Sequence, residues 1–460
     1  MSTYEQFVAA KLGIVQSSGI DAPLRDYGLF PHQSDLTRWA LRRGRAAIFA
    51  DTGLGKMRMA IAWADAVCSH TARPVIILCP LAVAQQFVAE GLLMGVSVTH
   101  CRESGDVLPG INITNYDRMH KFDMSVFGGV ALDESSLIKS HASKTLALLM
   151  AAFRSTPFKL CCTATPSPND WTELGTHAEF LGVRRRSEML AEFFVHDGGD
   201  TSVWRLKGHA RSVFWRWVAS WGAMIRSPAD LGYDASAYNL PSLTIHQHTV
   251  EIEHNPEHGL FAMEAQTLSE RRKARRDSMA QRVKACADMV NADDEPWIVW
   301  CDLNDEGDML ANAIPDAVQV AGADENDTKE SRMAGFSAGN HRVLVSKQKI
   351  CGWGMNWQHC ARQAFVGVND SYEGFYQAVR RSWRFGQKRP VEIHVFASNQ
   401  DGAVVANIKR KQAAAEEMSC AMSSETLEAV RSEVLGARKD TNNYTPAIGI
   451  VMPSFFGAAA

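Results

Sequence analysis

A lysine that follows two closely spaced glycines has the clearest chemical signature in this chain. Residues 46–57 read AAIFADTGLGKM, an apolar run, predicted to be a buried strand, that leads into a glycine-rich turn ending at Lys56. Gly53 and Gly55 would let the backbone turn its amides inward, and Lys56 would open a helix whose N-terminus faces phosphates. The pattern predicts a nucleotide-phosphate cradle made by Thr52, Gly53, Leu54, Gly55, Lys56 and Met57, in which the lysine holds the β and γ phosphates.

The cradle departs from the common GxxxxGK[ST] pattern at two positions. Ala50 stands in place of the first glycine, and Met57 stands in place of the serine or threonine that follows the lysine. That hydroxyl normally helps to hold Mg²⁺, and a thioether is a poor ligand for this cation. Taken alone, the stretch also fits a strand-to-helix turn with no special function.

Two acidic residues follow a later apolar run. Beyond the cradle, helical stretches alternate with short apolar runs at 75–79, 111–114, 130–132 and 158–162. This alternation predicts a parallel sheet covered by helices, with ligands at the carboxyl ends of its strands. Asp133 and Glu134 come directly after 130–132, where Asp133 would orient Mg²⁺ and Glu134 would polarise an attacking water. A lone Asp-Glu pair is usually part of a solvated loop, but a cradle on the same sheet favours the catalytic interpretation.

Three further polar residues fall near the expected ends of elements in this half. Gln33, in LFPHQ ahead of the cradle, can donate and accept hydrogen bonds at once, which suits the edge of adenine. A glutamine by itself is more often solvent-facing. Thr163 and Thr165, in TATP after the run 158–162, could sense a γ-phosphate and signal its presence to a neighbouring lobe. Thr-Pro is also an ordinary strand-ending turn.

A second set of apolar runs lies at 297–301, 317–320, 343–345, 365–368 and 391–396. It predicts a second parallel sheet without a cradle, which would act on the nucleotide of the first. The stretch QAVRRSWRFGQ at 377–387 places Arg381 and Arg384 three residues apart, so that both share one helix face and can reach a γ-phosphate across a cleft. A planar guanidinium suits that charge better than a lysine amine. The alternative is a surface arginine cluster.

The stretch KICGWGMNW, upstream of the arginines, contains two glycines and an asparagine. Gly352 and Gly354 permit tight backbone turns, and Asn356 can fix such turns by hydrogen bonds. We expect these residues to couple the two halves.

The region between the two sets of runs is rich in tryptophan and arginine. Trp215, Trp217 and Trp221 would form either a packed accessory core, which their helical spacing favours, or a surface that stacks on nucleic acid. Residues 269–284, SERRKARRDSMAQRVK, are expected to be a solvated charged helix, with contact to a DNA backbone as the alternative.

Bulk properties restrict the class of protein. The chain has 460 residues and a net charge of −3, so any contact with nucleic acid should be local rather than spread over a basic surface. Its ten cysteines contain no CxxC pair, which indicates reduced thiols rather than a zinc site or a disulfide framework. Neither a secretion signal nor a membrane span is indicated, and we expect a cytoplasmic protein.

Six stretches in order resemble the motifs of superfamily-two helicases: LFPHQ, ADTGLGKM, ILCPLAVAQQFVAE, ITNYDRM, ALDESSLIKS and CCTATPSPNDWTEL. The arginine stretch resembles the RxxRxGQ form of the SWI/SNF-type branch of double-stranded DNA translocases. The sequences GWGMNWQHC and SYEGFYQAVRRSWRFGQ most resemble those of compact phage-encoded DEAD/DEAH-like helicases. The resemblance covers about residues 28–400 and implies an α/β fold, a P-loop NTPase with two RecA-like parallel-sheet lobes, a helical insertion and a C-terminal tail.

The resemblance also implies a division of the chain and of its roles. The expected parts are an N-terminal extension (1–24), an ATP-binding lobe (25–180), a helical insertion and linker (181–290), a C-terminal lobe (291–415) and a tail (416–460). ATP and Mg²⁺ would be the cofactors, with Lys56, Glu134, Arg381 and Arg384 catalytic and Gln377 at the nucleotide. The expected partner is DNA, with the double-stranded form favoured, and a phage-encoded protein would act in the host cytoplasm.

The implied activity is that of an ATP-dependent DNA helicase or translocase. Protein partners in replication, recombination or restriction fit it equally well. A competing class is an ATP-gated DNA clamp with little turnover, which Met57 favours and the intact Glu134, Arg381 and Arg384 oppose. An RNA helicase is a third class, which the RxxRxGQ form disfavours.

Overall fold

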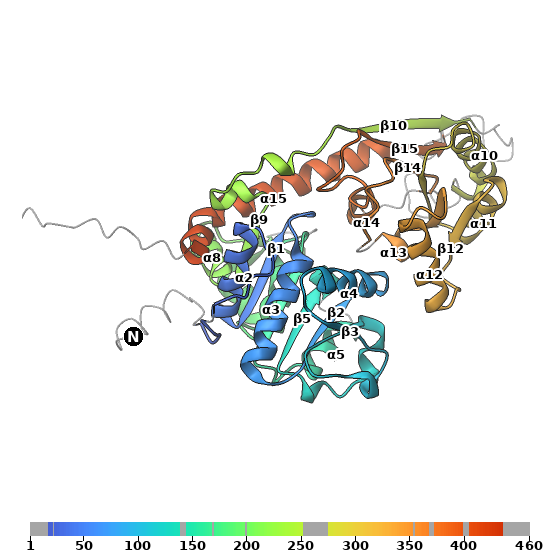
Figure 1. Ribbon diagram of the computed structural model, residues 1–460. Helices are drawn as coiled ribbons and strands as arrows, with labels where there is room; N and C mark the ends of the chain where they lie inside the picture. Colours follow the sequence, from blue (N-terminus) through green and yellow to red (C-terminus); the bar gives the residue numbers. More distant parts are fainter. Residues whose placement is uncertain are drawn as a thin grey trace, which may run out of the picture.

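The computed structural model describes residues 17–21, 23–138, 144–167, 170–197, 200–251, 275–352, 355–367, 372–398 and 404–435. Within these residues the chain forms two lobes, each organised around a parallel β-sheet (Figure 1). The two sheets that the apolar runs predict are therefore confirmed.

The first lobe contains a seven-stranded sheet in the order β3-β4-β2-β5-β6-β1-β9. Its strands are β1 (Arg45–Ala50), β2 (Val75–Cys79), β3 (Val98–His100), β4 (Ile111–Asn115), β5 (Gly129–Asp133), β6 (Phe158–Thr163) and β9 (Gly222–Ile225). Its helices are α2 (Pro31–Arg43), α3 (Lys56–Thr71), α4 (Ala84–Leu93), α5 (Lys144–Ala152), α6 (Leu174–Leu181), α7 (Arg186–Phe193) and α8 (Arg211–Ala219). A hairpin of β7 (Phe194–Asp197) and β8 (Asp200–Leu206) lies between α7 and α8.

Alternation along β1 shows how this sheet separates two cores. Ile48 and Ala50 belong to the core that contains α2 and α3, whereas Phe49 belongs to the core on the other face, with α6 and α8. Successive side chains of a strand point to opposite faces, so both faces of a strand buried on two sides must be apolar. The carboxyl end of β1 thereby places the cradle at the open edge of the sheet, directly before α3.

The second lobe contains a six-stranded sheet in the order β10-β15-β14-β11-β13-β12. Its strands are β10 (Leu243–Val250), β11 (Trp297–Cys301), β12 (Ala317–Val320), β13 (Val343–Lys347), β14 (Arg362–Phe365) and β15 (Val391–Ser398). Its helices are α10 (Met279–Val290), α11 (Asn304–Ala313), α12 (Asn326–Ser337), α13 (Gln348–Cys351) and α14 (Tyr372–Val379). The strand predicted at 365–368 is misplaced, since β14 ends at Phe365. Val368 lies outside the described residues.

The described parts of residues 181–290 are divided between the lobes, which differs from the helical insertion expected there. The strand β9 pairs with β1 and completes the first sheet, and β10 pairs with β15 at the edge of the second. Both strands escaped the sequence pattern for physical reasons. The first is only four residues long, and the second alternates exposed with half-buried residues as an edge strand does.

A 32-residue helix, α15 (Val404–Leu435), follows the second lobe and returns to the first, where it packs against α8, β9 and α2 (Figure 1). Val430 and Val434 enter the core beside α2 and α3, while Met422 joins the core on the opposite face of the first sheet. Arg211 forms an ion pair with Glu425 at 2.8 Å, and Arg43 pairs with Glu433. The expected boundary at 415/416 therefore falls inside one helix that joins the two lobes.

All ten cysteines are free thiols, and only Cys420 is exposed. Among the described residues, no helix combines the length and apolar character that crossing a bilayer requires.

Candidate nucleotide site between the lobes

The cradle forms a tight turn between β1 and α3. Gly53 and Gly55 have φ angles of +91° and +82°, in the left-handed region that residues with a side chain rarely adopt. Lys56 opens α3, and its Nζ donates to the carbonyl oxygens of Ala50 at 2.7 Å and Asp51 at 3.2 Å. Burial lowers the pKa of Lys56, while the nearby carboxylates of Glu134, Asp51 and Asp133 oppose this shift. A lysine held among carboxylates at a helix N-terminus is suited to exchange these carbonyls for phosphate oxygens.

Gln33 connects α2 to the cradle. Its Nε2 donates to the carbonyl oxygen of Leu54 at 3.1 Å, and its Oε1 accepts from the amide of Phe30 at 3.1 Å. The side chain is buried, and a Cβ at Gly55 would lie 2.2 Å from Nε2. The amide keeps one further donor and one further acceptor site, so recognition of adenine by Gln33 stays a prediction.

Asp133 and Glu134 lie at the carboxyl end of β5, as the sequence predicts, and both are buried. Burial and the neighbouring charge of Glu134 raise the pKa of Asp133 to about 7, whereas Lys56 and Arg381 lower it. Glu134 has a φ of 52°, a left-handed conformation that is uncommon outside glycine and is concentrated at functional sites. Its Oε2 has no hydrogen-bond partner among the described residues. A buried carboxylate oxygen without a partner is available to a ligand or a water.

Two side chains support this acidic pair from within the first lobe. Tyr116 donates its hydroxyl to the carbonyl oxygen of Asp133 at 2.7 Å. Ser135 Oγ lies 3.1 Å from His177 Nε2, and burial lowers the pKa of His177 to about 4. An imidazole with such a pKa is neutral at pH 7, so it positions the loop without adding charge to the site. Neither residue was singled out in the sequence, because Tyr116 lies within ITNYDRM without a role assigned to it and His177 lies outside the motifs.

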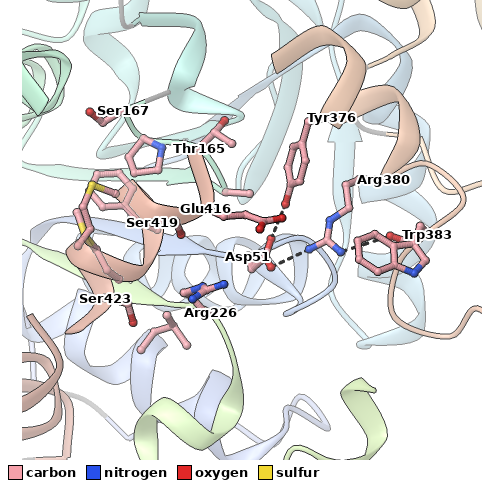
Figure 2. A pocket seen from close by; sticks show the side chains of 16 residues that line it. Asp51, Thr165, Ser167, Arg226, Tyr376, Arg380, Trp383, Glu416, Ser419 and Ser423 are labelled. Carbon is pink, nitrogen blue, oxygen red and sulfur yellow. Dashed lines mark hydrogen bonds and ion pairs between the residues drawn. The ribbon is translucent and has the colours of Figure 1, made fainter. Parts of the chain in front are cut away.

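Thr163 and Thr165 follow at the end of β6. The amide of Thr165 donates to Thr163 Oγ1 at 3.1 Å. Thr165 Oγ1 is buried and has no hydrogen-bond partner among the described residues. The free hydroxyl faces the cleft that the second lobe covers, next to Tyr376 and Arg380 (Figure 2).

The second lobe supplies Arg381 and Arg384, but not from a common helix face. The helix α14 ends at Val379, and both arginines belong to the turn that follows. They converge because both donate to the carbonyl oxygen of Met355, at 3.0 and 3.2 Å. Arg381 also donates to Gln377 Oε1 at 3.0 Å, which places Gln377 behind the arginine. The expectation of one shared helix face is therefore wrong, because the helix ends before the first arginine.

The electrostatics show which groups these arginines face. Burial lowers the pKa of Arg381, while Glu134 and then Asp133 raise it. Burial, Arg381 and Arg380 lower the pKa of Arg384 to about 9, and Glu134 opposes them. Guanidinium groups crowded together repel one another, so the position of Arg381 and Arg384 is suited to an anion, while Arg380 already has the carboxylate of Asp51 as its partner.

A second contact between the lobes involves three residues that lie within the motifs but were not singled out there. Arg380 Nη2 lies 2.7 Å from Asp51 Oδ2, and Tyr376 donates its hydroxyl to Asp51 Oδ1 at 3.1 Å (Figure 2). Burial alone would raise the pKa of Asp51, but Arg380 holds it below its ordinary value. The spacing of Tyr376 and Arg380, four residues apart on a helix end, was the available signal.

Phe385 covers the cradle from the second lobe. A Cβ placed on Gly53 would lie 2.8 Å from Phe385 Cβ and 3.1 Å from the Phe385 amide nitrogen. The ring of Phe385 also contacts that of Tyr238, at 4.6 Å between centroids. The glycine at position 53 thus serves both the turn and the approach of the second lobe.

The expected coupling stretch is described only in part. Gly352 follows α13, and its amide donates to the carbonyl oxygen of Gln348 at 2.8 Å. A Cβ there would lie 2.2 Å from that oxygen, so the close turn excludes a side chain. Asn356 is exposed, and Gly354 lies outside the described residues. The coupling role of these residues stays a prediction.

Two expectations for the middle region are settled by burial. Trp215, Trp217 and Trp221 are buried in the core of the first lobe, so they pack rather than stack on nucleic acid. Arg282, from the basic run, is also buried and pairs with Glu306 at 2.8 Å. The described part of that run is thus not a fully solvated connector, and residues 269–274 lie outside the described residues.

The residues at this edge fit a magnesium nucleotide. The buried oxygen of Glu134, the hydroxyl of Thr165 and Gln377 Nε2 are polar atoms without partners among the described residues. Asp133 offers an oxygen ligand for Mg²⁺, which commonly uses one or two carboxylates together with phosphate oxygens and waters. The described residues contain no cluster of three or more His, Cys, Asp or Glu that could hold a metal alone. A cation at this edge would therefore depend on the phosphates for its remaining ligands.

Comparison with solved structures identifies the fold. The chain is similar to S. cerevisiae Dbp5 bound to RNA and ADP BeF3, with a TM-score of 0.54 and 9% identity, over 87% of this chain and 98% of that chain. The chain has the two-lobed fold of a RecA-like helicase core. A single-substitution variant of Dbp5 with the same ligands matches at a TM-score of 0.51 and 10% identity, with the same coverage of both chains.

Another solved structure is less similar in fold. A Sulfolobus solfataricus SWI2/SNF2 ATPase core in complex with dsDNA aligns over 92% of this chain and 98% of that chain at 15% identity. Its TM-score is 0.39. No protein-family model matches the sequence, and no curated protein sequence is significantly similar to it.

Proposed function

We propose that this chain is an ATP-driven motor on nucleic acid, a DNA helicase or translocase for which double-stranded DNA is the favoured track. The observation that carries the proposal is a cross-cleft arrangement. Arg380 and Phe385, which flank Arg381 and Arg384 in the second lobe, contact Asp51 and Gly53 of the cradle that contains Lys56. A hydrolytic site divided between two lobes couples the state of the nucleotide to the distance between them.

Each residue has a role that its position supports. Lys56 and the cradle amides hold the β and γ phosphates, and Asp133 orients the cation. Mg²⁺ supplies charge neutralisation between the phosphate oxygens when it is bound. Glu134, with its unpaired Oε2, positions the attacking water and accepts its proton. Arg381 and Arg384 stabilise the negative charge that develops on the transferred phosphoryl group.

The choice of DNA depends on sequence resemblance and not on contacts. The RxxRxGQ form of residues 381–387 resembles translocases on duplex DNA. The fold is shared with Dbp5, whose structure contains RNA. The nucleic acid is therefore the first variable of the test.

Steady-state ATP hydrolysis should be measured without nucleic acid and with single-stranded DNA, double-stranded DNA and RNA. The Glu134→Gln variant serves as the blank, because it keeps the size of the side chain and removes the carboxylate. We expect stimulation by duplex DNA that is lost in the variant. Stronger stimulation by RNA than by either DNA would overturn the choice of track.

One observation favours a second candidate, an ATP-gated clamp on DNA. The side chain of Met57, at the position of the usual magnesium hydroxyl, packs against the core of the first lobe and contributes no oxygen. Tight binding of ATP and DNA with no turnover above the Glu134→Gln blank would identify the clamp and exclude the motor.

A further inference from the structure

Asp51 is the point where the second lobe touches the start of the cradle. Its carboxylate has three partners: its Oδ1 accepts from the amide of Thr52 at 2.6 Å and from the hydroxyl of Tyr376 at 3.1 Å, and its Oδ2 lies 2.7 Å from Arg380 Nη2. The backbone carbonyl of the same residue accepts from Lys56 Nζ at 3.2 Å. One residue of the first lobe therefore binds both the phosphate-holding lysine and two side chains of the other lobe.

Arg380 is held firmly on the side of the second lobe. Its side chain is only 5% exposed, and its guanidinium lies 5.1 Å from the centroid of Trp383 and 5.4 Å from that of Tyr376. A buried cation between aromatic rings loses its hydration, so its carboxylate partner becomes essential. The ion pair with Asp51 therefore resists separation of the lobes at this point.

Arg380 does not act as a third arginine on the phosphates. Its guanidinium lines a cavity of about 180 Å³ together with Thr165, Arg226 and Glu416 (Figure 2). Arg381 and Arg384 instead donate to the carbonyl oxygen of Met355. Arg381 bonds to Met355 and Gln377 within its own lobe, so Arg380 is the arginine of this turn that bonds to the first lobe. The contact of Phe385 with Gly53 lies five residues further along the same segment.

We propose that Asp51, Arg380 and Tyr376 form an inter-lobe latch that positions Arg381 and Arg384 for catalysis. This inference rests on the proposed ATPase. Arg380 and Tyr376 are positioning residues, because their side chains bond to Asp51 of the first lobe. Loss of the latch lets the turn that carries the arginines move away from Glu134, and a displacement of about 1 Å at such a site can cost roughly a hundredfold in rate.

The test compares Arg380→Ala, Arg380→Lys and Asp51→Asn with Arg389→Ala. The last variant is a matched control, because it removes an ion pair with Glu295 that lies within the second lobe and is half exposed. We expect Arg380→Ala to lower kcat by roughly ten- to a hundredfold with less than about a threefold change in KM for ATP. Arg380→Lys should recover part of the rate. The double variant Asp51→Asn with Arg380→Ala should be no slower than the slower single variant.

A second measurement separates this inference from the proposed function. Dyes on Ser187→Cys in α7 and Gln281→Cys in α10, with Cys420→Ser to remove the exposed thiol, report the distance between the lobes by energy transfer. Arg380→Ala should lengthen that distance and Arg389→Ala should not, whether or not the wild type hydrolyses ATP. Unchanged lobe distance in Arg380→Ala, additive effects in the double variant, or equal loss of rate in Arg389→Ala would each overturn the latch.

Discussion

The cradle and the acidic edge, which comprises Asp133, Glu134 and Thr165, lie on the same sheet but differ in how their polar groups are bonded. In and around the cradle, Lys56, Gln33 and Asp51 are all bonded to neighbouring backbone or to the second lobe. At the acidic edge, Glu134 Oε2 and Thr165 Oγ1 are buried without a partner among the described residues. Bonds within the chain therefore fix the geometry of the cradle. The unpartnered atoms of the acidic edge instead need a ligand or a water as their partner.

This difference separates two kinds of functional residue. A substitution in the cradle can distort the turn or prevent the approach of the second lobe. Its effect should therefore appear in the free energy of unfolding or in the distance between the lobes. An acidic-edge residue can be replaced with little structural cost, because its free atoms bond to nothing in the fold. Its loss should show in turnover alone. The following variants test that division.

The largest effect is expected for Arg381→Ala. Arginines that act on the transferred phosphoryl group contribute roughly 10³-fold or more to turnover. Arg381 faces the carboxylates of Glu134 and Asp133, so its removal should lower kcat by about three orders of magnitude in a steady-state assay. Arg381 also donates to Met355 and Gln377 within its own lobe, so its loss has a structural component as well.

Arg384→Ala provides a comparison with a smaller structural component. Among the described residues, the Arg384 guanidinium makes one hydrogen bond, to the carbonyl oxygen of Met355. Both variants should retain ATP binding and cooperative thermal unfolding. Wild-type turnover in Arg381→Ala, in a protein that melts as the wild type does, would contradict a catalytic role for this side of the cleft.

A smaller loss is expected for Gly53→Ala. The new methyl group would require an unfavourable backbone conformation at φ +91° and would collide with Phe385 Cβ at 2.8 Å. We expect a tenfold or greater loss of turnover, caused by incomplete approach of the second lobe, as read by kcat and by energy transfer between the lobes.

Gly95→Ala is the matched control, because it introduces left-handed backbone strain without a collision with a neighbouring residue. Gly95 has a φ of +67°, and a Cβ there would meet no atom within 4 Å. Both variants should lose about 1 kcal/mol of stability from the left-handed backbone, but only Gly53→Ala should lose activity. Equal activity in the two variants would show that the approach of Phe385 to the cradle has no functional role.

Local patterns predicted the elements and the motifs that lie within one segment. The strands Val75–Cys79 and Trp297–Cys301 agree with their apolar runs residue for residue, because strands buried on both faces read as continuous apolar segments. The cradle and the acidic pair were found for a similar reason. Each is set by a strand end and the turn that directly follows it.

Contacts between distant segments were not predictable in this way. Tyr376 and Asp51 are 325 positions apart, and no pattern within either segment indicates the other. The shared helix face of Arg381 and Arg384 was wrong because helix α14 ends at Val379, and helix ends depend on tertiary contacts as well as on composition. The surface that α15 covers was left open, because its mixed-charge sequence does not specify whether it packs on a lobe or on a partner.

Met57→Thr tests whether the cradle limits the chemistry at the acidic edge. A hydroxyl at this position can coordinate Mg²⁺, which the thioether does poorly. We expect the threonine variant to show higher turnover, or half-maximal activity at a severalfold lower Mg²⁺ concentration. Met57 packs against the core of the first lobe, so the substitution also removes apolar contacts.

The valine variant, Met57→Val, has the shape of threonine without the hydroxyl and controls for that lost packing. The difference between the two variants in a magnesium titration isolates the oxygen ligand. Identical magnesium dependence in methionine, valine and threonine forms would mean that water already fills the position without cost.

The smallest effect at neutral pH is expected for His177→Gln. His177 supports the acidic edge through its contact with Ser135. Burial lowers the pKa of His177 from 6.5 to about 4, so between these values the unfolded chain binds a proton that the folded chain excludes. The free energy of unfolding should therefore fall as pH drops from about 6.5 to 4, by up to roughly 3 kcal/mol.

Glutamine does not titrate, so its variant should lose less stability over this range in urea unfolding at pH 7, 6 and 5. Parallel stability curves for wild type and His177→Gln would show that His177 does not stay neutral in the fold, and the support of the acidic edge would then include a charge.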